Sequence, residues 1–386
     1  MNVTYYKIEK LLAYVFFCFF IIQILSPSLN GKTIYLEVII AILNPFFYKW
    51  IYSQRIKKEY FVILYGIMNF SLWGHFETSL KLLVTFFLVI YLYYLHDKDL
   101  WKMDKYIYIS IFFAIAQFTF LFINPEWSFN IGSNNIAKFV WGEYATASYS
   151  NYYTVFFMPR VSGLAREAGF MASLIIVYIF YKYIQRDRKK LNVKEKILIG
   201  IGYILSFSKM SLIIIVVFII NKLKRFINYI PFLFILLFWM IFMCIFWIYN
   251  IDYLRDIVNV TFLARFGSYL ILFDTNIIQL LFGVGNNLLE INSYWVDFMS
   301  SIGDVFSGLA YFIIYNGLVG TLIYFISLYL IGVSSTGLLI LLLFTINVQL
   351  DTNQNFVVLS YFIIFKYYTN NNVNRLKSFL VKIEKD

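Results

Sequence analysis

Apolar blocks of roughly 15 to 22 residues run along most of this chain, and a block of that length is what a bilayer-spanning helix requires. The 386 residues are 61% hydrophobic and only 14% charged, with a mean hydropathy of +0.73. A soluble domain is nearer 45 to 50% apolar, with about 25% charged residues. Lipid is therefore expected to be the solvent for most of the chain.

The blocks predict a series of single spans and one broken helix pair. Residues 197–221 have cytoplasm-type basic charge on both sides, so a single crossing would break the positive-inside rule. Their polar centre predicts two short helices, with Lys209 in a protein-lined or water-lined cavity, because irregular backbone at membrane depth needs one. Single spans are expected near residues 11–25, 33–50, 60–73, 80–95, 106–123, 168–184, 230–249, 309–330, 332–346 and 356–368.

Basic clusters alternate with neutral connections along the chain. The clusters within residues 55–58, 98–105 and 186–196 place these connections, and with them both termini, in the cytoplasm. Because the clusters lie beside apolar spans, they explain the net charge of +11, and no nucleic-acid partner is expected. The predicted fold class is an all-α polytopic membrane protein, a single integral membrane domain with about twelve transmembrane helices.

Two long connections fall on the outer side in this topology, residues 124–166 and 250–308, and their many aromatic and aliphatic residues favour order. They contain four of the nine arginines, although positive-inside bias depletes basic residues there. Arginine grips phosphate through a fixed fork of donors, so these residues predict an anion site, for example for a diphosphate. The alternative is pairing with nearby acids or lipid headgroups. The four are Arg160, Arg166, Arg255 and Arg265.

Few residues are suited to act as a general base. His75 and His96 are the only histidines, which argues against chemistry built on His clusters, and no metal or other cofactor is expected. Among the outer acids Glu167 stands out, because it follows Arg166 at the foot of an apolar helix, whereas Asp304 is a secondary candidate. A base must lie within reach of the hydroxyl that it deprotonates.

Four short motifs follow one another between residues 159 and 320. Their order and spacing, on a topology with two long outer loops, resemble the O-antigen polymerases of the Wzy type, within the larger group that includes the O-antigen ligases. The N-terminal half is similar to that family only in being hydrophobic. The motifs are Pro159-Arg160-Val161-Ser162-Gly163-Leu164-Ala165-Arg166-Glu167, Leu205-Ser206-Phe207-Ser208-Lys209, Arg265 followed by Leu281-Phe282-Gly283-Val284-Gly285, and Tyr315-Asn316-Gly317-Leu318-Val319-Gly320.

Two departures from the family pattern bear on this resemblance. Lys209 stands where the family more often carries Arg, which keeps the charge but loses the fork of donors. No histidine lies near Asp304, where ligases tend to carry one, and this favours a polymerase.

The resemblance implies a metal-independent glycosyltransferase with an all-helical, GT-C-like fold in the bacterial cytoplasmic (inner) membrane. Its donor would be a growing glycan on undecaprenyl diphosphate, and its acceptor a lipid-linked repeat unit, as in the synthesis of lipopolysaccharide O-antigen or capsule. Partners would be membrane lipids, a repeat-unit flippase and a chain-length regulator. A ligase, or a flippase or other transporter of lipid-linked oligosaccharide, remains an alternative, although no internal repeat of the kind common in transporters is visible.

The resemblance also implies roles for individual residues. Arg160, Arg166 and Arg265 would stabilise the leaving diphosphate as its charge develops, and Lys209 would support the same anion. Glu167 would orient or deprotonate the acceptor hydroxyl. Tyr315, in the last motif, is a secondary site candidate.

Overall fold

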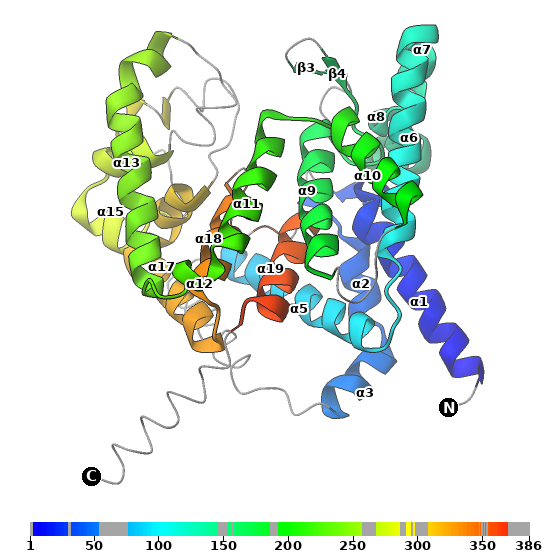
Figure 1. Ribbon diagram of the computed structural model, residues 1–386, viewed down its shortest axis with the longest axis horizontal. Helices are drawn as coiled ribbons and strands as arrows, with labels where there is room; N and C mark the ends of the chain where they lie inside the picture. Colours follow the sequence, from blue (N-terminus) through cyan, green and yellow to red (C-terminus); the bar gives the residue numbers. More distant parts are fainter. Residues whose placement is uncertain are drawn as a thin grey trace. The chain divides into compact units, whose positions relative to one another are not determined.

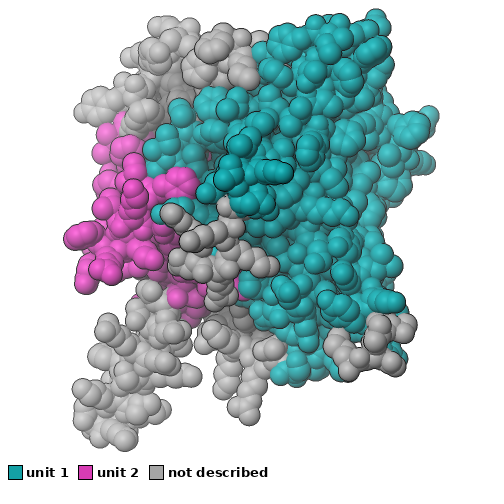
Figure 2. Space-filling view, turned by 45° about the vertical axis from the view of Figure 1, so that its right-hand side comes forward, with its two compact units in different colours: residues 1–55, 87–216 teal, residues 56–86, 217–386 magenta. Residues whose placement is uncertain are grey.

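The computed structural model describes most of the chain, which divides into two compact units (Figure 2). Unit 1 comprises residues 1–55 and 87–216, and unit 2 comprises residues 56–86 and 217–386. The predicted span at 60–73 lies outside the described residues, as do Arg265 and Asp304. The described residues are 3–29, 32–53, 76–145, 153–155, 158–185, 192–256, 268–285, 291–294, 296–297, 308–346, 348, 350, 352 and 354–369.

Unit 1 is built from helices and two short antiparallel hairpins (Figure 1). Within it α10 packs against both α6 and α9, and α1 packs against α2 and α6. In chain order its elements are α1 (Val3–Ile21), η1 (Gln23–Leu25), β1 (Ser28–Leu29), β2 (Lys32–Thr33), α2 (Leu36–Ile42), α3 (Pro45–Ser53), the second half of α5 (Phe76–Asp97), α6 (Met103–Ile123), α7 (Pro125–Asn130), α8 (Ser133–Trp141), η2 (Gly142–Tyr144), β3 (Tyr153–Val155), β4 (Met158–Arg160), α9 (Ala168–Ile184), α10 (Val193–Leu205), η4 (Lys209–Leu212) and the start of α11 (Ile213–Lys222).

The regular elements in the described part of unit 2 are helices, and an isolated antiparallel bridge joins Val333 to Thr369. Within this unit α15 packs on α17, and α18 packs on α12, α13 and α19 (Figure 1). Residues 268–274 are also helical. Besides the first part of α5 and the rest of α11, its helices are α12 (Lys224–Ile227), α13 (Phe232–Asp256), α15 (Ile277–Phe282), α17 (Gly308–Ile331), α18 (Ser335–Phe344) and α19 (Asn355–Tyr367).

Three helices in the described part of the chain are long and apolar enough to cross a membrane, namely 79–97 in α5, α6 and α17. Shorter apolar helices include α9, α11, α18 and α19. Helix α13 exposes a series of large apolar side chains, which suits a surface that faces lipid rather than water. These features are those of an all-α membrane protein, as predicted, whereas the count of twelve spans stays a prediction. The exposed residues of α13 are Leu233, Phe234, Leu237, Phe238, Ile241, Phe242 and Ile245.

The predicted span at 33–50 is divided into α2 and α3. Proline has no backbone N–H and disfavours helical conformation in the residue before it, so Pro45 separates the two helices. Asn44 Oδ1 accepts from the backbone N–H of Phe46 at 3.0 Å, and its Nδ2 donates to Tyr91 Oη at 2.7 Å. The division therefore follows from an Asn-Pro pair that its surroundings satisfy.

The first helix also differs from its prediction. Helix α1 begins at Val3, well before the apolar block at 11–25, and it ends at Ile21. Its polar first turns include Glu9, which is 3% exposed and accepts a hydrogen bond from Tyr94 Oη. The helix thus extends beyond the apolar block because a buried partner satisfies its one buried acid.

Residues 197–221 form two helices with a break between them. Helix α10 begins with a capping box, in which Asn192 Oδ1 accepts from Glu195 N and Glu195 Oε2 accepts from Asn192 N. Helix α10 ends at Leu205, and helical structure resumes with η4 and α11. The side chain of Lys209, at the start of η4, lies outside the described residues, so its placement in a cavity stays a prediction.

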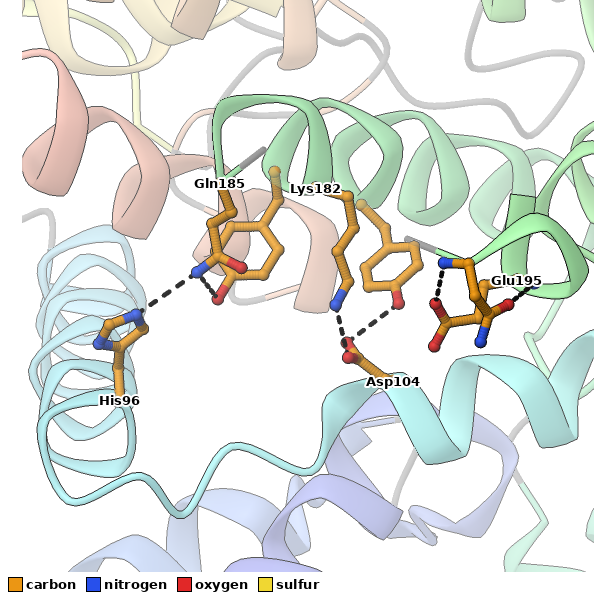
Figure 3. Close-up of polar contacts among 8 residues, drawn as sticks. His96, Asp104, Lys182, Gln185 and Glu195 are labelled. Carbon is orange, nitrogen blue, oxygen red and sulfur yellow. Dashed lines mark hydrogen bonds and ion pairs between the residues drawn. The ribbon is translucent and has the colours of Figure 1, made fainter. Parts of the chain in front are cut away.

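The end of α9 remote from Glu167 is held to α6 by Asp104 (Figure 3). Lys182 Nζ donates to Asp104 Oδ2 at 2.5 Å, and Tyr178 Oη donates to Oδ1 at 3.0 Å. One turn further along the chain, Gln185 Nε2 contacts His96 Nε2 at 3.4 Å. These contacts fix the position of α9 against α6, and α9 carries Glu167 at its other end.

We expect Asp104→Asn to lower the free energy of unfolding by about 1 to 3 kcal/mol, because it leaves the ammonium of Lys182, which is 11% exposed, without its counter-ion. Thermal unfolding of the purified protein in detergent measures the change. The matched control is Asp97→Asn, since Asp97 is 45% exposed and lies 3.9 Å from His96. Equal melting temperatures for the two variants would contradict the anchoring role.

Candidate functional site

The first two motifs lie against each other in unit 1. The segment from Arg160 to Glu167 joins strand β4 to helix α9, and Val161 N donates to Leu205 O at 3.0 Å. Leu205 ends α10, where a carbonyl has no partner within its own helix. Element η4, which starts at Lys209, packs on α9. The structure therefore brings the backbone of the arginine segment to the helix break.

The side chain of Gln117, on α6, holds this segment by hydrogen bonds to its backbone. It donates to Gly163 O at 2.9 Å and accepts from Gly163 N at 2.9 Å, so both polar groups of that residue are satisfied. Ser110 Oγ accepts from Leu164 N at 3.1 Å. Gly163 has a φ of +56°, and a Cβ there would lie 2.6 Å from Met171 Sδ and 2.7 Å from Ser110 O. Only glycine fits this position without displacing its neighbours.

Serine side chains form hydrogen bonds with backbone groups at the break between α10 and η4. Ser206 Oγ donates to Gly202 O at 2.8 Å, and Ser208 N donates to Ser211 Oγ at 3.0 Å. Ser211 N in turn donates to Ser208 O at 2.8 Å. Short hydroxyl side chains suit this purpose, because they reach local backbone groups that a helix would otherwise pair. The serine-rich sequence is thus what allows the break.

Arg166 has buried donors that the protein leaves unmet. Its Nε and Nη2 are buried and have no hydrogen-bond partner among the described residues. The guanidinium carbon lies 5.8 Å from the centre of the Tyr35 ring, within the range of a cation–π contact. The backbone is held, since Ser133 Oγ donates to Arg166 O at 3.4 Å. The segment is thus fixed while two of the guanidinium donors stay available.

Glu37 of α2 is an acid that the sequence reasoning missed. It is 4% exposed, its Oε2 has no hydrogen-bond partner in the described residues, and the positive charge of Arg166 acts on its carboxylate. Its sequence signal is an ionisable residue inside a predicted span, the criterion that singled out Lys209. Tyr35 and Gln117 carried no comparable signal, because single aromatic or amide residues in apolar segments are common.

Glu167 lies at the N-terminus of α9 with extended backbone, φ −148° and ψ 164°. Its Oε1 is 3.0 Å from the position that a Cβ on Gly169 would occupy, so its side chain folds over the first turn of its own helix. A carboxylate is stabilised there by the positive end of the helix dipole. Glu167 is half-buried and directly follows Arg166 in the chain.

The last two motifs lie against each other in unit 2. Helix α17 is interrupted at Gly317, whose φ of 74° and ψ of 167° are not helical. Val284 N donates to Ile314 O at 3.0 Å, and Gly285 N donates to Tyr315 O at 3.1 Å. The chain after α15 thus satisfies two carbonyls that the interrupted helix cannot.

Two glycines make this contact possible. A Cβ on Gly283 would lie 2.4 Å from Tyr315 O, and a Cβ on Gly317 would lie 2.3 Å from Leu281 O. Asn316 beside them is 3% exposed, and its Nδ2 donates to Phe312 O at 3.0 Å. The Gly-Val-Gly sequence is therefore a backbone packing element.

The predicted site residues fall into three groups. Arg160, Arg166 and Glu167 lie on one segment of unit 1. Lys209 belongs to the same group, because it follows closely after Leu205, whose carbonyl accepts a hydrogen bond from that segment. Tyr315 is buried at 7% exposure in the core of unit 2, beside the Tyr311 ring. The third group is outside the described atoms: the side chain of Arg255, near the end of α13, and all of Arg265 and Asp304.

Comparisons with protein-family models, with curated proteins and with solved structures found no significant match.

We expect Gly163→Ala to destabilise the protein by about 1 to 3 kcal/mol more than Gly142→Ala, since overpacking adds to the strain that a positive φ causes at both positions. The two glycines have almost equal φ values, +56° and +57°, but a Cβ on Gly142 meets nothing within 4 Å. Thermal unfolding in detergent and the level of each variant in the membrane measure the difference. Similar losses for both variants would show that Gly163 is not tightly packed.

We expect Gly317→Ala to separate the two motifs of unit 2 and to lower the melting temperature strongly, because its Cβ would overlap backbone that cannot rotate away. Gly200→Ala is the matched control, since this helical glycine of α10 has open space around it and alanine favours helix by about 0.5 to 1 kcal/mol. Unfolding of both variants in one detergent tests this. A tolerated Gly317→Ala would contradict the close contact.

Proposed function

We propose that this chain is a polysaccharide polymerase of the bacterial cytoplasmic membrane. It transfers a growing glycan from undecaprenyl diphosphate to a lipid-linked oligosaccharide repeat unit at the outer face, in O-antigen or capsule synthesis. The observation that carries the proposal is the pair of buried donors on Arg166, Nε and Nη2, without a hydrogen-bond partner among the described residues.

A phosphate group fits these donors. Leaving buried N–H groups without acceptors costs about 1 to 3 kcal/mol each, and more for a charged group, so an anionic ligand that accepts both is favoured. The guanidinium fork matches the oxygens of phosphate or carboxylate. An undecaprenyl diphosphate offers such oxygens at the membrane surface, and the topology predicted from the charge pattern supports a place for this segment there.

The rigid backbone around Arg166 supports catalysis rather than binding alone. Gln117 and Ser110 hold the segment through three hydrogen bonds, so the donors need not reorganise as negative charge develops on the leaving diphosphate. In this proposal Arg160 acts on the same charge and Lys209 contributes further positive charge, while roles for Arg265 and Arg255 stay predictions of the resemblance. Arginine donors supply this stabilisation without a metal.

A ligase is the nearest alternative, because it cleaves the same diphosphate linkage but delivers the glycan to a different acceptor. A flippase also binds the anion, yet it needs no group that deprotonates a hydroxyl. The nature of the acceptor separates the first alternative from a polymerase, and glycan chain length separates the second.

The test is a cell-surface glycan ladder from a deletion strain complemented with wild type, Arg160→Ala, Arg166→Gln, Arg265→Ala or Glu167→Ala at matched protein levels. We expect the deletion to leave single repeat units, and each arginine variant to reduce polymer on the order of a hundredfold, as for other lost transition-state donors. Arg166→Lys keeps the charge and should restore only part of the ladder, because it loses the fork.

Lys138→Ala is the control. Lys138 is an exposed cation of α8, the helix whose Ser133 donates to Arg166 O. It should restore the full ladder. A ladder that is unchanged in the deletion strain contradicts an enzyme of polymerisation and makes transport the leading hypothesis. Polymer of normal chain length that is not attached to its final acceptor indicates the ligase instead.

A further inference from the structure

We propose that Glu37 is the carboxylate that binds and deprotonates the acceptor hydroxyl beside Arg166. This assignment rests on the glycosyltransferase function proposed above. It gives the base role to α2, a helix that belongs to none of the four motifs, and it leaves Glu167 as a positioning residue.

Glu37 is buried without the partners that a structural carboxylate has. It is 4% exposed, and its Oε2 has no hydrogen-bond partner in the described part of the chain. By comparison, the buried Glu9 of α1 is bonded to Tyr94, and Asp104 is bonded to both Lys182 and Tyr178. The Glu37 carboxylate has a hydrogen bond from its own backbone, which leaves Oε2 unsatisfied. Burial of an unsatisfied carboxylate oxygen is costly, and an ionisable residue within a membrane segment is a functional candidate by default.

Glu37 and Arg166 have complementary needs that they do not meet in each other. The Arg166 guanidinium carbon lies 5.8 Å from the centre of the Tyr35 ring, at the start of the helix that carries Glu37, but no hydrogen bond or ion pair joins the Glu37 and Arg166 side chains in the residues that the structure describes. One acceptor oxygen and two donor nitrogens therefore stay available. A ligand with a hydroxyl and a phosphate satisfies both sides at once, because the hydroxyl donates to Glu37 and the phosphate accepts from Arg166.

Glu167 is less suited to the same task. Its side chain folds over the first turn of α9, with Oε1 3.0 Å from the Cβ position of Gly169, and it has further interactions in the structure. Both acids lie at a helix N-terminus, but the Glu167 side chain has partners, whereas Glu37 Oε2 has none in the described residues. Glu167 thus orients Arg166, while Glu37 accepts the proton.

The reaction balances with these two side chains. The acceptor hydroxyl oxygen forms a bond to the anomeric carbon of the donor glycan, and its proton passes to Glu37 Oε2. The bond between that carbon and the diphosphate oxygen breaks, and its electron pair leaves with the diphosphate, whose charge Arg166 stabilises. Glu37 later releases the proton to water.

Two measurements on the full-length protein test the assignment: the surface glycan ladder at matched protein levels, and binding of undecaprenyl diphosphate to the purified protein in detergent. We expect Glu37→Gln to reduce polymer on the order of a hundredfold, the usual effect of losing a general base, while diphosphate binding is unchanged or tighter. Arg166→Gln should weaken diphosphate binding about tenfold or more. Glu126→Gln, on the exposed surface of α7, is the matched control and should behave as wild type in both assays.

Glu37→Asp separates a base from a counter-ion, and also serves if Glu37→Gln does not accumulate. It keeps the negative charge but withdraws the carboxylate by one methylene, so a base loses about tenfold or more in polymer formation, whereas a counter-ion of Arg166 does not. Wild-type polymer from Glu37→Asp overturns the assignment. So does a loss of diphosphate binding in Glu37→Gln as large as that in Arg166→Gln.

Failure of this inference is distinct from failure of the proposed function. If Arg166→Gln abolishes the ladder but Glu37→Gln leaves it intact, the polymerase proposal stands and the base is another residue. If the deletion leaves the ladder unchanged and wild-type protein does not bind undecaprenyl diphosphate, the proposed function itself is wrong.

Discussion

In lipid, every backbone N–H and C=O group needs a partner within the protein, and the non-helical segments of this chain depend on that constraint. Gln117 pairs with both polar groups of Gly163, and serines pair with the ends exposed by the break after α10. The chain after α15 pairs with carbonyls that the interruption of α17 leaves open. Departures from helix therefore occur where a second segment or a short polar side chain completes the hydrogen bonding.

The same constraint explains why the four motifs form two pairs. Val161 bonds to Leu205 in unit 1, and Gly285 bonds to Tyr315 in unit 2. In unit 2 this backbone contact needs glycine where the two segments meet, at Gly283 and Gly317, because a Cβ would overlap the neighbouring atoms. Short sequences far apart in the chain are thus parts of single packing elements, and each helps to form a rigid frame.

Within the frame of unit 1, Arg166 and Glu37 are exceptions to the rule that buried polar groups are satisfied. The backbone groups of the segment are paired at Gly163, Leu164 and Arg166, so the unmet side-chain donors and acceptor do not result from loose packing of the backbone. Groups that are unsatisfied in the free protein and complementary in charge are what a polar, anionic substrate requires. The frame keeps them in place without providing the missing bonds.

The sequence by itself determined the helical membrane character, the approximate helix bounds and the location of the arginine segment. Apolar blocks, caps and charge clusters act over a few residues, so a single segment contains the whole signal. The Asn44–Pro45 division of the span at 33–50 was also readable in this way, although block length concealed it. Only the tertiary structure decided that Gln117 holds Gly163, and that Arg166 lies beside Tyr35 at the start of α2. These relations depend on contacts between residues far apart in the chain, which no local pattern of residues encodes.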